Sequence, residues 1–186
     1  LSKRAEKVHA GIDPHIDNML RITSDGRKLG LDQRIINPML PDEPGTKVNK
    51  CVANVLRIWK EGDSERLTQL VFCDIATPSG KPNDDENAPF TNIYDDIRRK
   101  LIAGGMAPEQ VAFIHSAKTD IQKKELFAKV RSGQVRVLIG STQKMGAGTN
   151  VQDRLIALHD LDCPWRPRDV GRILRTFKIK KNVEVT

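Results

Sequence analysis

Short apolar runs that alternate with helical segments are the feature that most restricts the fold of this chain. The runs span residues 67–75, 111–115, 135–139 and 155–158, while helical spacing of apolar residues marks 47–61, 93–103 and 119–130. Nearly continuous apolar runs are typical of strands that are buried on both faces. Alternation of such strands with helices predicts an α/β fold, with a doubly wound, mostly parallel sheet covered on both sides.

The first 45 residues differ from the rest. They lack clear periodicity and are rich in helix-breaking residues, namely Gly11, Pro14, Gly26, Gly30, Pro38, Pro41 and Pro44. We therefore predict two parts: residues 1–45 as an irregular N-terminal arm or linker with one short helix near its start, and residues 46–186 as the α/β domain.

Charge and cysteine content narrow the possible partners. The 186 residues carry a formal net charge of +7, which favours polyanions such as nucleic acid as partners, although basicity alone also serves solubility.

The three cysteines, Cys51, Cys73 and Cys163, have no CxxC spacing, so we expect no zinc site and no disulfide framework, and a reducing, cytoplasmic location. No apolar run approaches the ~20 residues that a membrane span requires.

In a sheet of this kind, ligands bind outside the carboxyl ends of the strands. The polar residues that follow the four predicted strands are Asp74 and Thr77, His115 and Ser116, Ser141 and Thr142, and His159, Asp160 and Asp162. The two histidines have no partner at ligand spacing, so we interpret them as packing or hydrogen-bonding residues and predict no metal site.

Five motifs occur in order along the predicted domain: residues 70–77, residues 114–116, Ser141-Thr142 followed by Gly146, Gly148, Thr149 and Asn150, then residues 160–167, and finally Gly171-Arg172-Ile173-Leu174-Arg175. Their order resembles motif IV to motif VI of the superfamily 2 helicases, especially the Swi/Snf-like DNA translocases. The resemblance covers residues 47–175, about two thirds of the chain, and implies the C-terminal RecA-like domain of such a motor.

The resemblance also implies site residues. Gly146, Gly148, Thr149 and Asn150 would lie against the nucleotide, and glycines there let backbone amides approach a phosphate. Thr149 and Asn150 could donate either to a DNA phosphate or to the nucleotide of the partner domain. Thr77, His115, Ser116 and Thr142 would contact nucleic acid, with duplex DNA as the expected partner. Arg172 and Arg175 would be catalytic arginine fingers, three residues apart and so on one face of a helix.

The chain has no GxxxxGK[ST] phosphate loop, and the acidic residues 84–86 follow no predicted strand. We therefore expect no ATP hydrolysis by this chain alone. The resemblance implies that ATP and Mg²⁺ are bound mainly by an N-terminal RecA-like domain of the same polypeptide.

Two alternatives stay open. Residues 168–170 run directly into Gly171, about four residues shorter than in the family, which favours a catalytically inert, helicase-like DNA-binding or scaffold domain. A small nucleotide hydrolase is disfavoured, because no phosphate loop or catalytic dyad is present in the sequence.

The segment 17–38 of the arm is similar to helicases fused to DNA methylases on phages and mobile elements, which would imply a bacterial protein.

Overall fold

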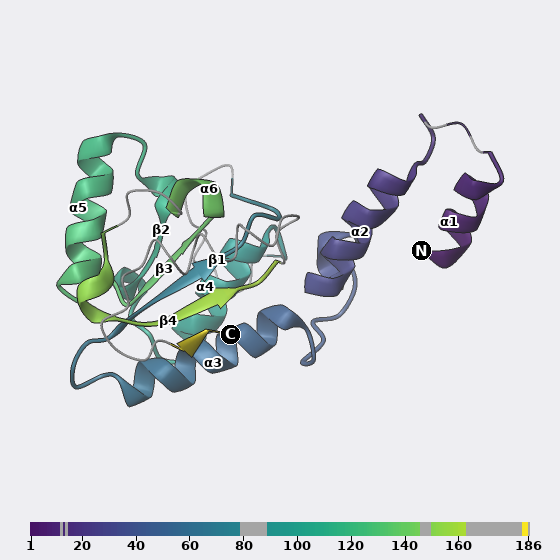
Figure 1. The fold of residues 1–186 in the computed structure, drawn as a ribbon. Coiled ribbons are helices and arrows are strands. Elements are labelled where there is room, and N and C mark those ends of the chain that lie inside the picture. The colour runs from purple at the N-terminus through teal and green to yellow at the C-terminus, as the bar shows by residue number, and fades with distance from the viewer. Residues whose placement is uncertain (12, 14, 79–88, 146–149, 163–183, 186) are drawn as a thin grey trace.

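The computed structural model describes residues 1–11, 13, 15–78, 89–145, 150–162 and 184–185. Two helices of an N-terminal arm, α1 (Ser2–His9) and α2 (Met19–Leu31), project from an α/β domain (Figure 1). The domain's helices are α3 (Lys47–Glu61), α4 (Ile93–Ala103), α5 (Asp120–Arg131) and α6 (Thr142–Met145). Its strands are β1 (Thr68–Phe72), β2 (Val111–Phe113), β3 (Val137–Gly140), β4 (Leu155–Asp160) and β5 (Glu184–Val185).

The strands form one sheet in the order β2-β3-β1-β4-β5, and every pair is parallel. This confirms the predicted α/β class and parallel sheet. Because all the strands run the same way, their carboxyl ends meet at one edge. The loops that follow β1, β2, β3 and β4 therefore lie along that edge.

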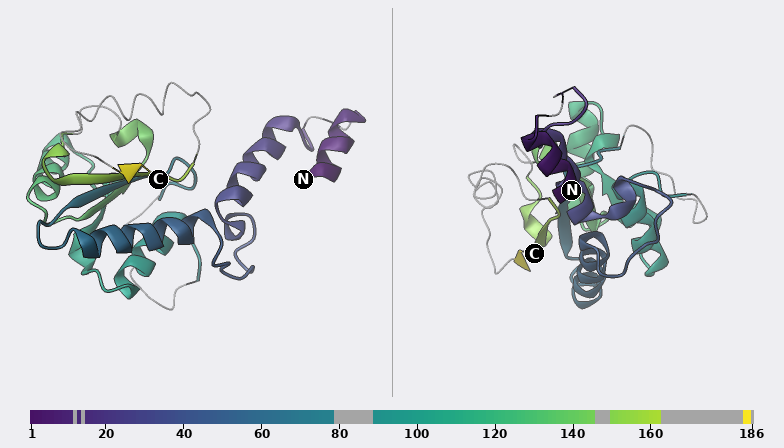
Figure 2. Two further views of the ribbon diagram at one scale, coloured as in Figure 1. Left: turned by 60° about the horizontal axis from the view of Figure 1, so that its bottom comes forward. Right: turned by 90° about the vertical axis from the view of Figure 1, so that its right-hand side faces the viewer.

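Helices cover the two faces of the sheet. Helices α3 and α4 pack on one face, where Val55, Ile97 and Val71 belong to the larger core (Figure 2). Helix α5 and α6 lie on the other face, where Val130 and Met145 pack on inward-facing side chains of the strands. Each strand is thus buried on both sides, which explains the continuous apolar runs in the sequence.

Capping residues explain why α3 and α4 have the predicted bounds. The Thr46 side chain accepts a hydrogen bond from the Asn49 N–H, and Gly62 ends α3. The Asn92 side chain accepts from the Asp95 N–H, and Gly104 ends α4. A side chain that satisfies a free N–H of the first turn fixes where a helix begins.

The arm contains more helix than the sequence predicts. We expected one short helix, but the arm has α1, the 13-residue α2, and a 3₁₀ turn (Gln33–Ile35). Helix α2 includes Gly26 and Gly30 in spite of their low propensity. It forms because Asn18 caps its first turn, and because Ile22 and Leu31 are buried. Tertiary packing here overrides the local signal.

Candidate functional site

The predicted nucleic-acid residues follow neighbouring strands at the carboxyl edge of the sheet. Thr77 is exposed and follows β1, while the half-buried Thr142 begins α6 directly after β3. His115 and Ser116 lie in a 3₁₀ turn (Ile114–Ser116) after β2, and this turn contacts α6. The fold therefore puts these four residues along one edge. Their contacts with nucleic acid stay a prediction.

Of the predicted nucleotide-side residues, the structure describes Asn150, which is exposed and whose backbone carbonyl accepts a hydrogen bond from Arg131 at 2.8 Å. Gly146, Gly148, Thr149, Arg172 and Arg175 lie outside the described residues, as does the stretch from Cys163 to Pro167. The roles proposed for them stay predictions.

Two aspartates connect the loops at this edge. The Asp162 Oδ2 atom accepts hydrogen bonds from the backbone N–H groups of Asp74 and Ile75, each at 2.7 Å. The Asp74 Oδ1 atom accepts a hydrogen bond from the Thr142 N–H at 2.7 Å. The loops after β4, β1 and β3 are thereby joined in series. The sequence placed both aspartates at strand ends but gave them no role.

The carboxylates at this edge affect one another. Burial, and then the neighbouring carboxylates of Asp162 and Asp74, raise the pKa of Asp160 to about 6. Burial also raises the pKa of Asp162, against its two hydrogen bonds from backbone N–H groups. Among the described residues, no group of three His, Cys, Asp or Glu side chains is arranged to hold a metal ion.

The two histidines differ in their surroundings. His159 is 1% exposed, and its Nε2 lies 2.9 Å from Oε1 of Gln69, which confirms the hydrogen-bonding role predicted for it. Burial lowers its pKa to about 4, so the ring is neutral at pH 7. The ring of His115 packs edge-on against Tyr94, with 5.4 Å between centroids. Burial and then Lys144 lower the pKa of His115, and its buried Nδ1 has no hydrogen-bond partner among the described residues.

The cysteines that the structure describes are inert. Cys73 is fully buried, and Cys51 is 6% exposed. Burial raises the pKa of Cys51 to about 12 and that of Cys73 higher still. Neither thiol is a nucleophile at neutral pH, because the thiolate is the reactive form.

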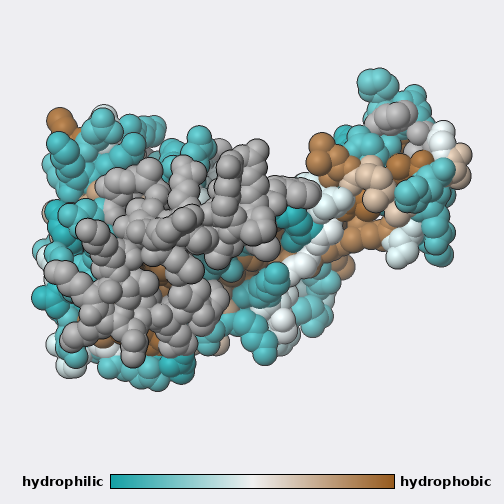
Figure 3. Space-filling view, in the orientation of Figure 1, coloured by the Kyte–Doolittle hydropathy of each residue, from teal (hydrophilic) through white to brown (hydrophobic). Residues whose placement is uncertain are grey.

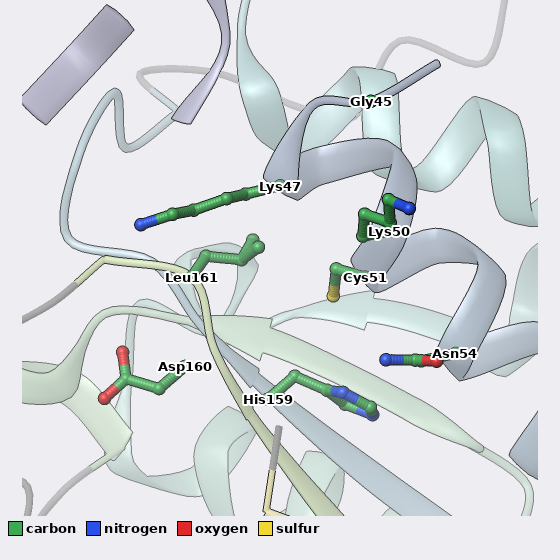
Figure 4. Close-up of a pocket in the computed structure, with 8 residues that line it drawn as sticks. All are labelled: Gly45, Lys47, Lys50, Cys51, Asn54, His159, Asp160 and Leu161. Carbon is green, nitrogen blue, oxygen red and sulfur yellow. The ribbon is translucent and has the colours of Figure 1, made fainter. Parts of the chain in front are cut away.

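A hollow of about 250 Å³ lies beside the end of β4 (Figure 4). Lys47, Lys50 and Asn54 line it from α3, with Asp160 and Leu161 opposite. Of the polar residues that the sequence places at strand ends, His159 and Asp160 line it, but no residue predicted to contact nucleotide or nucleic acid does. Its two lysines begin a helix at the surface, so the hollow gives no evidence of a catalytic centre.

No protein-family model matches the sequence, and no curated protein matches it. Among solved structures, the C-terminal part of the Fun30 ATPase domain aligns with a TM-score of 0.53 and 15% identity, covering 87% of this chain and 48% of that one. The Hef helicase domain of Pyrococcus furiosus aligns with a TM-score of 0.46 and 13% identity, covering 99% of this chain and 33% of that one.

The chain therefore spans about half the length of the Fun30 structure. In the described part of the chain, no helix is long and apolar enough to cross a bilayer. At this level of identity, the likeness shows the fold alone: the protein has a RecA-like α/β domain whose fold is similar to that of the C-terminal part of the Fun30 ATPase domain.

Proposed function

We propose that this chain is the second RecA-like domain of an ATP-dependent DNA helicase or translocase. It contributes DNA contacts from its strand-end loops and arginine fingers from Arg172 and Arg175. ATP and Mg²⁺ are bound mainly by an N-terminal RecA-like domain of the same polypeptide, and the domain on its own does not hydrolyse ATP.

One observation carries the proposal. The loops that contain Thr77, His115, Ser116 and Thr142 all follow carboxyl ends of parallel strands, at the edge where α/β sheets bind their ligands. In the sequence, Arg172 and Arg175 follow β4, and the carboxyl end of β4 lies at this edge. A motor needs both functions on the same side of the domain, so that closure on ATP and contact with DNA depend on each other.

The arginines have a clear physical task in this proposal. Their planar, permanently charged side chains match the oxygens of a γ-phosphoryl group during transfer. Such a residue contributes about 10³–10⁵ in rate when a second domain inserts it. The shortened segment before Gly171 favours the alternative, an inert helicase-like scaffold, because a deletion there would rotate both arginines away from the nucleotide.

DNA-stimulated ATP hydrolysis by the full-length protein tests the proposal, with Arg172→Ala and Arg175→Ala beside the wild type. We expect at least one of the two changes to lower the stimulated rate by about 10³-fold or more. Arg57→Ala is the matched control, because Arg57 is an exposed arginine of α3 that pairs with Glu61. Absence of turnover, or a rate indifferent to both site changes, would establish the inert alternative instead.

A further inference from the structure

We infer that Asp162 and Asp74 form a latch that couples the DNA-facing loop after β1 to the loops after β3 and β4. The inference rests on the proposed function and adds two positioning residues to it. Through the latch, contact with DNA at Thr77 is transmitted to the segments that begin at Thr142 and continue beyond Asp162.

The first half of the latch is a carboxylate held by two consecutive amides. The side chain of Asp162 is buried, with 5% of the residue exposed, and a single oxygen accepts both the Asp74 and Ile75 N–H groups at 2.7 Å. Successive amides that converge on one anion form a concave binding site within the backbone. Hydrogen bonds to a charged acceptor are about twice as strong as neutral ones. Asp162 therefore fixes the backbone of the β1 loop.

The second half runs from the β1 loop to the β3 loop. Because the amide of Asp74 is fixed by Asp162, the Asp74 side chain is oriented to accept the Thr142 N–H at 2.7 Å. Asp74 is exposed to solvent, so this bond competes with water and can open. Loss of Asp162 releases Asp74, and release of Asp74 frees Thr142.

The latch begins where the sheet ends. The last backbone bonds between these strands are Cys73 N–H to the Gly140 carbonyl and Leu161 N–H to the Phe72 carbonyl, each at 3.0 Å. Beyond them, in the described part of the chain, hydrogen bonds from the side chains of Asp162 and Asp74 connect the three loops. These bonds can therefore break without any change in the sheet, which a core hydrogen bond cannot do.

The backbone between the latch and Thr77 is strained. Ala76 has a φ of 56°, a left-handed conformation that residues other than glycine rarely adopt. The N–H group of the neighbouring Ile75 donates to Asp162, and the Ile75 carbonyl accepts a hydrogen bond from the Cys73 thiol at 3.2 Å. Tyr94 anchors the start of the same loop by donating its hydroxyl hydrogen to the Cys73 carbonyl. Strain of this kind persists only where the surroundings hold it, and it is common at switching sites.

The test compares DNA-stimulated with DNA-independent ATP turnover in the full-length protein. The variants are Asp162→Ala, Asp74→Ala and the double change, with Asp120→Ala as a matched control at an exposed acid of α5. We expect the ratio of the two rates to fall about tenfold in each single variant, which is the effect of losing a charge-assisted hydrogen bond. The double variant should be no worse than Asp162→Ala, because the two residues act in series.

A variant that relieves the backbone strain at Ala76 tests the latch independently. Ala76→Gly removes the conformational constraint and keeps every latch bond available, so the same ratio should fall by a smaller factor. Asp74→Asn should keep much of the coupling, because its amide oxygen can still accept the Thr142 N–H.

A merely structural role would lower both rates together and leave their ratio unchanged, and that result would overturn the latch. Amide hydrogen exchange checks the geometry directly: Asp74 and Ile75 should lose protection in Asp162→Ala while the β1 core keeps it. If Asp162→Ala does not fold, the ratio of the two rates in Asp74→Ala tests the latch, because Asp74 is exposed and its loss leaves the core intact. A wild type without DNA-stimulated turnover overturns the proposed function instead, and the exchange experiment still reports on the latch.

Discussion

At the scale of single residues, Asp160 is the clearest source of pH dependence. It is half-buried at the end of β4, and its pKa of about 6 lies above the ordinary 3.8, because burial and then Asp162 and Asp74 disfavour its charge. An acid whose pKa is raised by folding lowers the stability as pH rises above its unfolded pKa, because the unfolded chain then loses the proton more readily than the folded one. The penalty is absent below about pH 4, grows between about pH 4 and 6, and is complete above that range.

Asp160→Asn should therefore stabilise the protein by about 1–2 kcal/mol at pH 7 to 8, since each pKa unit corresponds to about 1.36 kcal/mol and water screens part of the charge of this half-buried carboxylate. The gain should disappear below about pH 4, where the wild-type carboxyl is protonated in both states. Urea unfolding of wild type and variant across this pH range measures it. A gain that does not change with pH would mean that the substitution acts through packing and not through charge.

At the scale of elements, the connection of the arm to the domain rests on buried charge. Arg34 of the arm, 6% exposed, lies 2.8 Å from both Asp32 and Asp96, and its guanidinium stacks on the Phe90 ring at 4.5 Å. Lys100 of α4 pairs with Asp96 as well, at 2.8 Å. Figure 3 shows exposed apolar surface on the projecting arm. The apolar side chains of the arm are therefore only partly buried against the domain. The ion pairs therefore position the arm.

Arg34→Met should cost about 3–5 kcal/mol of folding stability, because it leaves the buried carboxylate of Asp32 without its ion-pair partner and leaves Lys100 as the nearest cation to Asp96. Lys123→Ala is the matched control. Lys123 pairs with the exposed Asp120, and such a surface pair contributes less than about 1 kcal/mol. Chemical denaturation compares the two. Equal effects would contradict a tethering role for the buried network.

The same elements show what the sequence can predict. The bounds of α3 and α4 follow from local caps, Thr46 and Asn92, that are visible in the sequence. Helix α2 also has a local cap, Asn18, but it was not predicted, because Gly26 and Gly30 interrupt its pattern and the burial of Ile22 and Leu31 depends on the folded chain. The hydrogen bonds of the latch are harder still to predict from the sequence, because Asp74 and Asp162 are 88 positions apart and only the strand order brings them together. Sequence placed both at one edge, but the bonds between them depend on the folded register.

At the scale of the whole molecule, charge separates the two parts. Residues 1–45 contain 7 Lys and Arg and 7 Asp and Glu, so the net charge of +7 belongs entirely to residues 46–186. Eight of the nine exposed large apolar side chains that the structure describes lie in the arm: Leu1, Ile16, Met19, Leu20, Leu29, Ile36, Met39 and Leu40. The α/β domain, and not the arm, therefore has the charge that attracts a polyanion.

DNA affinity should accordingly fall steeply with salt, by about 100-fold between roughly 50 and 200 mM if about four phosphates are contacted. Lys144→Ala, at an exposed residue of α6 beside Thr142, should reduce the slope of log K against log salt by about 0.9. Lys7→Ala, at an exposed lysine of α1, should leave the slope unchanged. Fluorescence anisotropy with the full-length protein and duplex DNA measures both. If Lys7 and Lys144 changed the slope equally, DNA would follow the arm as well as the strand-end edge, and the separation of roles between the two parts would be wrong.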